Sequence, residues 1–200
     1  RGPRARAPAG GRVGGLAGRG PIDPSPAHAI IGWLGRRPVG VYCGRMFRAG
    51  GVGEANARSA IAAALDAQPL SALIGPLACG ADILFAEEAL ARGIDLTIIL
   101  SCAEDDFIAQ SVASGGEAWL PRYVQCRDRA AMVHFASSSR YVSDDCQFIL
   151  GSHTAMGLAK LRARELETNA IQLAVVDPEI AARPSAVIAG TNADIALWQD

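Results

Sequence analysis

SALIGPLACGADILFAEEALARGIDLTIIL, residues 71–100, predicts a β-strand, a helix and a second β-strand in succession. The segments 71–77 and 94–100 are short apolar runs, and the second is as continuously apolar as strands that are buried on both faces of a parallel sheet. Between them, residues 79–93 place apolar side chains at helical spacing and end on an arginine–glycine stop. A strand, a helix and a strand in this order predict a right-handed crossover between parallel strands.

The same alternation continues along the rest of the chain and predicts an α/β fold. Further strands are expected at 38–44, 132–137 and 170–177, and further helices at 54–68, about 103–113, about 119–131, about 147–167 and 192–199. These elements predict a doubly wound, mostly parallel, five-stranded Rossmann-like sheet with helices on both faces. In such sheets ligands bind beyond the carboxyl ends of the strands, where the strand order reverses. We expect that point beside the strand at 38–44.

Length and composition favour one full-sized domain after a linker. The chain has 200 residues, of which 50% are hydrophobic and 20% charged, enough for one domain with a substantial core. Residues 1–37 are dominated by Gly, Pro, Ala and Arg, so we expect a disordered linker there and a domain over 38–200. No methionine opens the sequence. Together with the linker, this suggests a piece of a longer polypeptide whose other domains are its partners.

The distribution of charge argues against a nucleic-acid partner. The net charge of −1 combines +6 over residues 1–37 with −7 over the remainder, and Lys160 is the only lysine. Non-specific binding to nucleic acid depends on many lysine and arginine contacts to phosphates, which an acidic body does not provide. We therefore expect a small-molecule partner instead.

Cysteines and histidines offer no metal-site spacing. The five cysteines form no CxxC pair, and the three histidines do not cluster with them. No apolar run approaches the roughly 18 residues of a membrane-spanning helix, and no convincing signal peptide is present. We expect a reduced, cytoplasmic protein that lies outside the membrane, binds no metal and requires no cofactor.

The loop after the first expected strand is the first candidate for a binding site. CGRMFRAGGVG (43–53) lets the backbone turn sharply at Gly44, and Arg45 and Arg48 are placed to meet an anion beside free backbone N–H groups. The alternative is an ordinary glycine-rich surface loop with solvated arginines. Cys43 fits a small buried residue at a strand end better than a reactive thiol.

The turn after the second expected strand supplies a second candidate wall. Gly75, Cys79 and Gly80 bracket this turn, and Gly80 would let a phosphate or a ribose approach the first turn of the following helix. Asp82 in that same turn repels a phosphate, so it either caps the helix or reaches sugar hydroxyls. If Asp82 binds a ligand, we expect it to contact the sugar hydroxyls.

Two further segments complete the candidate site. SSSRYVSDD (137–145) packs hydroxyls, an arginine and acids into nine residues, and we place it at the expected reversal of strand order, with Ser138 and Arg140 as ligand contacts. A plain polar surface loop is the alternative. Asp177, with Thr191, flanks the exit of the last strand and would close the far rim.

Three stretches resemble one known superfamily. VYCGRMF (41–47), LIGPLACGADILFAEEALARGIDLTIIL (73–100) and CRDRAAMVHFAS (126–137) look like the SLOG superfamily, a Rossmann-like group that includes the Lonely Guy phosphoribohydrolases and the DNA-processing proteins. The resemblance covers about residues 38–199. It is nearest to bacterial signalling proteins in which such a domain accompanies tetratricopeptide repeats or a cyclase domain. It implies a nucleotide or ADP-ribose-type ligand.

The match to the Lonely Guy enzymes is incomplete. Cys43 and Gly44 lie where those enzymes have a CGSS-type loop, but their catalytic PGGxGTxxE motif is not found after the fourth expected strand. We therefore expect a module that senses a nucleotide derivative, without turnover. One alternative is a diverged phosphoribohydrolase-like enzyme whose acid is Asp82, Glu87 or Asp144. The other is a purely architectural domain whose glycine turns only satisfy backbone geometry.

Overall fold

A five-stranded parallel sheet forms the centre of the computed structural model, which describes residues 37–176 and 190–199. The strands are β1 (Val39–Gly44), β2 (Ala72–Gly75), β3 (Asp95–Leu100), β4 (Met132–Phe135) and β5 (Ala170–Val175). The longer helices are α2 (Val52–Ala67), α3 (Ala81–Ala91), α5 (Trp119–Arg129), α6 (Cys146–Glu165) and α8 (Thr191–Gln199). Each lies close to its position predicted from sequence.

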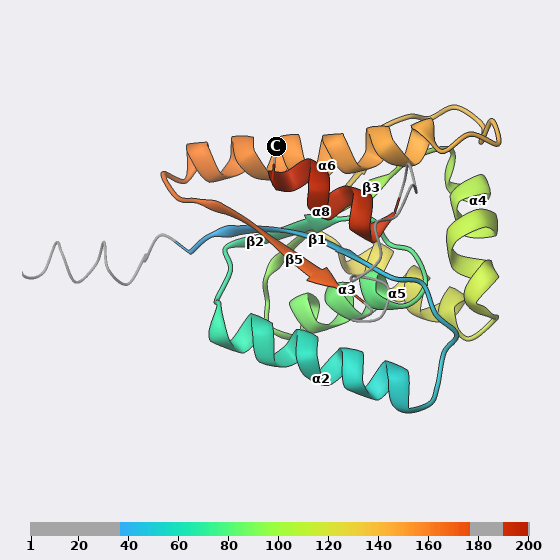
Figure 1. Cartoon of the computed structure of the whole chain (residues 1–200), viewed down its shortest axis with the longest axis horizontal. Coiled ribbons are helices and arrows are strands. Elements are labelled where there is room, and N and C mark those ends of the chain that lie inside the picture. The colour runs from blue at the N-terminus through green and yellow to red at the C-terminus, as the bar shows by residue number, and fades with distance from the viewer. Residues whose placement is uncertain (1–36, 177–189, 200) are drawn as a thin grey trace, which may run out of the picture. The chain divides into compact units, whose positions relative to one another are not determined.

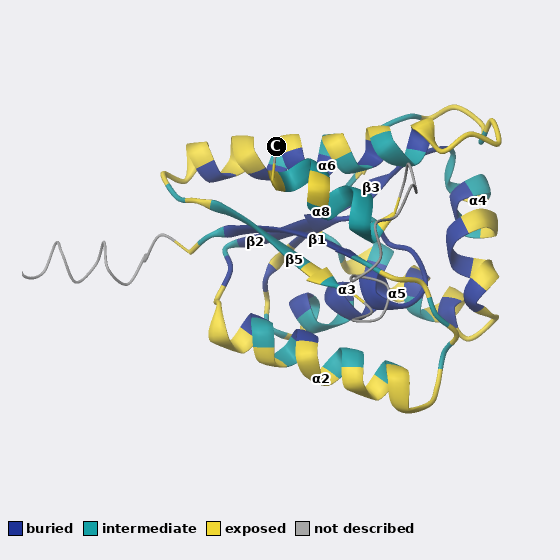
Figure 2. Ribbon diagram, viewed as in Figure 1, coloured by how far each residue is buried: buried dark blue, intermediate teal, exposed yellow. Residues whose placement is uncertain are grey.

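The strand order β4-β3-β2-β1-β5 confirms the α/β, doubly wound, Rossmann-like class, and every pairing is parallel. Figure 1 shows α2, α3 and α5 on one face of the sheet and α6 and α8 on the other. Two hydrophobic clusters result. Ile61, Leu65 and Tyr123 belong to the first, under α2, α3 and α5, while Ala159 of α6 belongs to the second. The central strands are therefore buried on both faces, as Figure 2 shows for β1 and β2.

The strand order reverses at β1, because β2 lies on one side of it and β5 on the other. This confirms the expected position beside the first strand. It contradicts the placement of the 137–145 loop at the reversal, since that loop follows β4, which is the edge strand farthest from β5. The sequence identifies strands by their apolar runs, but their lateral order depends on which crossovers pack over which face.

The helix expected at about 103–113 is not regular. It is built from a short α-helix, α4 (Glu104–Phe107), a π-helical turn, η1 (Ile108–Val112), and a 3-10 turn, η2 (Ala113–Gly115). The carbonyl of Ser111 accepts a hydrogen bond from the Cys79 N–H at 2.7 Å, and so binds the turn between β2 and α3. Isolated π turns are frequent at functional sites.

An ion-pair cluster holds α2, α3 and α5 together. Arg122 of α5 donates through Nε and one terminal nitrogen to the Glu87 carboxylate at 2.6 and 2.8 Å, and through the other to Glu54 at 2.8 Å. Arg58 of α2 pairs with the same Glu87 and with Glu88. The Arg122 guanidinium also lies 4.1 Å from the centre of the Trp119 ring. This cluster fixes α3, whose first turn faces the candidate site.

None of the helices in the described ranges is long and apolar enough to cross a membrane.

Candidate functional site

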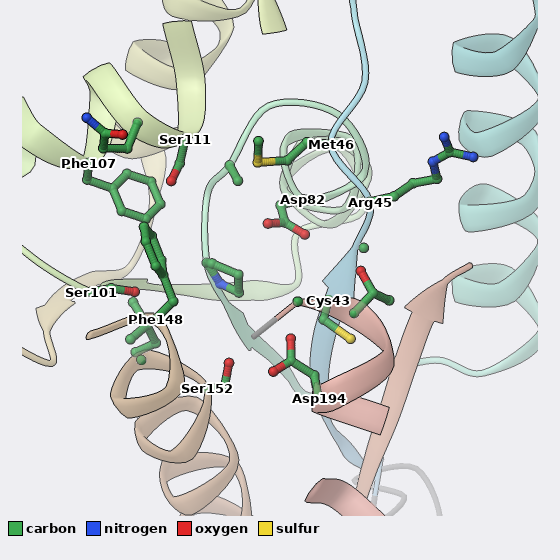
Figure 3. Close-up of a pocket in the computed structure, with 18 of the residues that line it drawn as sticks. Cys43, Arg45, Met46, Asp82, Ser101, Phe107, Ser111, Phe148, Ser152 and Asp194 are labelled. Atoms are coloured by element: carbon green, nitrogen blue, oxygen red, sulfur yellow. The ribbon is translucent and has the colours of Figure 1, made fainter. Parts of the chain in front are cut away.

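A cavity of about 460 Å³ lies beyond the carboxyl ends of β1, β2 and β3. Its walls come from segments distant in sequence, namely the end of β1, the start of α3, the α4–η1 segment, the first half of α6 and the start of α8. Figure 3 shows Asp82, Cys43 and Asp194 on one side of this space and Phe107 and Phe148 on the other. Its position agrees with the general rule for ligand sites in open α/β sheets.

Asp82 is the most unusual polar group in this cavity. Its side chain is 3% exposed, and Oδ1 has no hydrogen-bond partner among the described residues. Burial raises the pKa of Asp82 well above its ordinary value, and the charge of Asp194 raises it further, against hydrogen bonds from the backbone at Ala78 and Gly44. A buried, unpartnered carboxyl oxygen costs free energy unless a ligand or a water satisfies it.

The capping alternative for Asp82 is wrong. The N-cap position of α3 is Gly80, and no side chain caps this helix end. Asp82 lies inside the first turn and lines the cavity instead. This position leaves its carboxylate to face a bound molecule.

Asp194 is a second carboxylate that the sequence analysis missed. It lies in the first turn of α8 and lines the same cavity as Ser152 of α6. Burial raises the pKa of Asp194, while the Ser152 hydroxyl and the charge of His153 act in the opposite direction. Its only signal in the sequence is an acid in the first turn of the last expected helix, a common place for a solvated carboxylate.

The opposite side of the cavity is aromatic. Phe107 is fully buried at the end of α4, and Phe148 on α6 is half-buried, with the Tyr141 ring 5.6 Å from its own. Ser101, Ser111 and Ser152 also line the cavity. The cavity therefore offers an apolar platform and a hydrogen-bonding wall to one molecule.

The end of β1 contributes backbone rather than a cationic side chain. Gly44 and Arg45 both line the cavity, but the Arg45 side chain points away from Asp82 and Asp194 in Figure 3. The Arg45 carbonyl accepts a hydrogen bond from Ala81 N–H at 3.1 Å, which holds the loop on α3. Gly80 has a φ of 93°, and a Cβ there would lie 2.7 Å from the Arg45 carbonyl oxygen. Gly80 is thus required by close packing at this turn.

Gly75 and Cys79 do not line the cavity. A Cβ on Gly75 would come within 2.7 Å of the Tyr42 ring, so this glycine makes room for a core side chain. Cys79 is 1% exposed, with its sulfur 3.9 Å from Ser114 Oγ. Burial raises the pKa of the Cys79 thiol, which keeps it protonated at neutral pH.

Ser138 and Arg140 do not line this cavity. Both are exposed, and Arg140 Nε donates to Asp106 Oδ2 at 2.8 Å. Because their loop follows the edge strand β4, it lies at the side of the site, and only its last residue, Asp145, reaches the lining. Asp177 lies outside the described residues, whereas Thr191 lines the cavity.

Of the three acids considered for catalysis, only Asp82 lines the cavity. Burial raises the pKa of Glu87, but the hydrogen bonds and charges of Arg122 and Arg58 outweigh it and hold the pKa below its ordinary value. Asp144 is exposed, and the Cys146 backbone N–H lowers its pKa. Glu87 and Asp144 are therefore ionised at neutral pH, and neither lines the cavity.

Within residues 37–176 and 190–199, no three histidine, cysteine, aspartate or glutamate side chains gather as metal ligands. No protein-family model matches the sequence, and no curated protein matches it either.

Proposed function

We propose that this chain binds a nucleotide or a nucleotide derivative in the cavity beyond β1, β2 and β3. The observation that carries the proposal is the buried Asp82 side chain, which lines a cavity with an aromatic opposite wall and has one carboxyl oxygen without a partner among the described residues. A nucleoside combines a flat ring that stacks on an aromatic side chain with hydroxyls that donate hydrogen bonds. The aromatic wall suits the flat ring of a nucleoside, and the wall with Asp82 suits its hydroxyls.

The size of the cavity supports a ligand of this class. Small-molecule sites in proteins are typically about 300–1,000 Å³, and the cavity of about 460 Å³ falls within that range. The architectural alternative expects a crevice filled by side chains at this position, and the cavity argues against it.

The helix ends around the cavity suggest where a phosphate would lie. Asp145, the N-cap residue of α6, and Gly190 and Thr191 at the start of α8 line the cavity on segments other than the Asp82 turn. Helix N-termini attract phosphate through free N–H groups and the helix dipole. Each of these helix ends also carries a carboxylate, Asp145 at α6 and Asp194 at α8, so a phosphate there would be bound by the backbone N–H groups against that charge.

The wider role follows from the resemblance to the SLOG superfamily. It supports a ligand-sensing module within a bacterial signalling protein, where binding is read out by other domains of the same polypeptide. No catalytic cofactor is part of this role.

Thermal unfolding of the full chain with AMP, ATP, NAD, ADP-ribose and cyclic nucleotides tests the proposal. At a free ligand concentration a hundredfold above its dissociation constant, binding adds about 2.7 kcal/mol to stability. That corresponds to a rise of several degrees in the midpoint. Asp82→Asn should reduce the shift, whereas Arg140→Ala, an exposed residue that does not line the cavity, should preserve it. Unshifted midpoints with every ligand would contradict the proposal.

A diverged nucleotide-processing enzyme is the second candidate. It is favoured by the two carboxyls, Asp82 and Asp194, whose pKa values are both raised in one cavity, because a carboxyl that stays protonated near neutral pH can act as a general acid. Release of free base from nucleoside monophosphates, followed by chromatography, is the deciding assay. Release that is lost in Asp82→Asn would establish this candidate, and a complete lack of release would remove it.

A further inference from the structure

We infer that Asp82 and Asp194 together recognise the vicinal 2′- and 3′-hydroxyls of a ribose whose base lies against Phe148. This inference rests on the proposed function and narrows the ligand to ribonucleotides and their derivatives. It also assigns a ligand-binding role to α8, the helix that brings Asp194 to the site.

Two carboxylates from different helices line the cavity together. Asp82 comes from the first turn of α3 and Asp194 from the first turn of α8, and both side chains project into the same cavity in Figure 3. Both line one cavity, so a single ligand can reach both of them. Two neighbouring carboxylates offer acceptors for two adjacent hydroxyl donors.

Each of the two carboxylates has oxygen atoms that can accept a hydrogen bond from a ligand hydroxyl. Asp82 Oδ1 is buried and has no partner among the described residues. Asp194 also lines the cavity, and a carboxylate has about four acceptor positions, so it can accept from a ligand hydroxyl. A diol would satisfy Asp82 and join it to Asp194.

The surroundings of the two carboxylates favour a diol over an ammonium group, although both could donate hydrogen bonds to carboxylates. The N-terminal ends of α3, α6 and α8 all contribute to the lining, and their positive dipole ends disfavour a cation. Raised pKa values of both carboxyls also weaken the attraction for a cation. Neutral hydroxyls are not opposed by either effect.

The aromatic wall sets the orientation of the ligand. Phe148 lies across the cavity from the carboxylates, and its ring packs against the Tyr141 ring at 5.6 Å. A ribose held at Asp82 and Asp194 directs its base toward this ring. The ligand therefore spans α3, α6 and α8.

Attachment of α8 should depend on this ligand. The helix has no fully buried residue. It is held by Leu197 and Trp198 packing against the second hydrophobic cluster, by Gln172 Nε2 donating to the Asp194 carbonyl at 3.0 Å and by Lys160 lying 5.1 Å from the Trp198 ring centre. A ribose bound to Asp194 adds a contact between α8 and α3. Hydrogen exchange of the α8 amides should slow when the ribonucleotide binds.

Isothermal titration of the full chain with AMP, GMP, CMP and UMP and with their 2′-deoxy counterparts tests the inference. Leaving a buried carboxylate without its hydroxyl costs enough that the best ribonucleotide should bind at least about tenfold more tightly than its deoxy form. Asp82→Asn and Asp194→Asn should each reduce this ratio to within about threefold. Asp128→Asn, an exposed carboxylate on α5 away from the cavity, should leave the ratio unchanged.

The outcomes separate this inference from the function on which it rests. Equal affinity for ribo and deoxy forms would overturn the diol inference while nucleotide binding stands. An unchanged ratio in Asp194→Asn would overturn the role of α8, and so would unchanged exchange of its amides on binding AMP. If no nucleotide binds, both fall. Should Asp82→Asn fail to fold, Asp194→Asn and wild-type hydrogen exchange still decide.

Discussion

Gly44 at the end of β1 approaches Ala81 at the start of α3 so closely that a Cβ on Gly44 would lie 2.3 Å from the Cβ of Ala81. This contact brings the strand end and the first helical turn together at the cavity. The Ala81 N–H bond to the Arg45 carbonyl fixes the same approach. The position of Asp82, one residue further along α3, depends on it.

Gly44→Ala should therefore destabilise the protein, because neither backbone can give way. Overpacking typically costs about 1–3 kcal/mol, and we expect a loss of about 2–3 kcal/mol in urea unfolding. Gly157→Ala is the matched control, since Gly157 is an exposed residue in α6 with nothing within 4 Å of a new Cβ. That change should stabilise by about 0.5–1 kcal/mol. Equal effects at both positions would contradict the close approach.

Arg122→Ala should loosen the packing of α2, α3 and α5. Arg122 is 21% exposed and loses charge-assisted bonds to Glu87 and Glu54, which are comparably covered, so we expect a loss of about 2 kcal/mol in the free energy of unfolding. Arg162→Ala removes an exposed pair with Glu165 and should cost no more than about 0.5 kcal/mol. A small effect at Arg122 would show that the cluster adds little to stability.

The pH dependence of stability should reveal the buried state of Asp82. Since its pKa is raised on folding, its contribution is fully present below the unfolded pKa, about 3.9, and is lost as pH rises through the folded value. Asp82→Asn should therefore gain stability relative to the wild type between about pH 4 and pH 8, in thermal unfolding across that range.

Glu87→Gln provides the comparison of opposite sign. The folded pKa of Glu87 is lowered by Arg122 and Arg58 against the effect of burial, so its contribution is present above the unfolded pKa and is lost as pH falls. The variant should lose stability relative to the wild type as pH rises. The same sign for both variants would contradict the assigned environments.

Thiol reactivity should distinguish Cys146 from the other four cysteines. Cys146 is exposed, whereas the other four, at positions 43, 79, 102 and 126, are buried. A disulfide reagent should modify one thiol in the native protein and five after denaturation, and Cys146→Ser should abolish the native reaction. Because the thiolate is the reactive form, the native reaction should accelerate with pH, and the hydrogen bond with Asp144, which raises the pKa of Cys146, moves that rise to higher pH. Rapid modification of Cys43 would show that the cavity wall opens.

Much of the fold could be predicted from local patterns. The apolar runs at 71–77 and 94–100 fall on β2 and β3, and the intervening helical spacing falls on α3. The π turn at Ile108–Val112 was not predicted, since the bond from Cys79 to the Ser111 carbonyl joins residues distant in the sequence. Side-chain periodicity records burial, and it does not record such bonds.

The candidate site was predicted only in part, for a related reason. Gly44, Arg45 and Asp82 were placed at the cavity because a strand end and a helix start are recognisable in sequence. Arg140 was misplaced because its loop follows an edge strand. Asp194 was missed because its helix reaches the cavity only through its packing beside β5 and β1.

The sequence by itself determined the α/β class, the order of the elements along the chain and the Gly44 and Asp82 positions, because each depends on neighbours a few residues away. Only the tertiary structure decided that β4 lies at the edge, that the Arg45 side chain points away and that Asp194 joins Asp82. Those outcomes depend on which helices pack over which strands, and contacts between residues more than a hundred positions apart leave no local periodicity in the sequence.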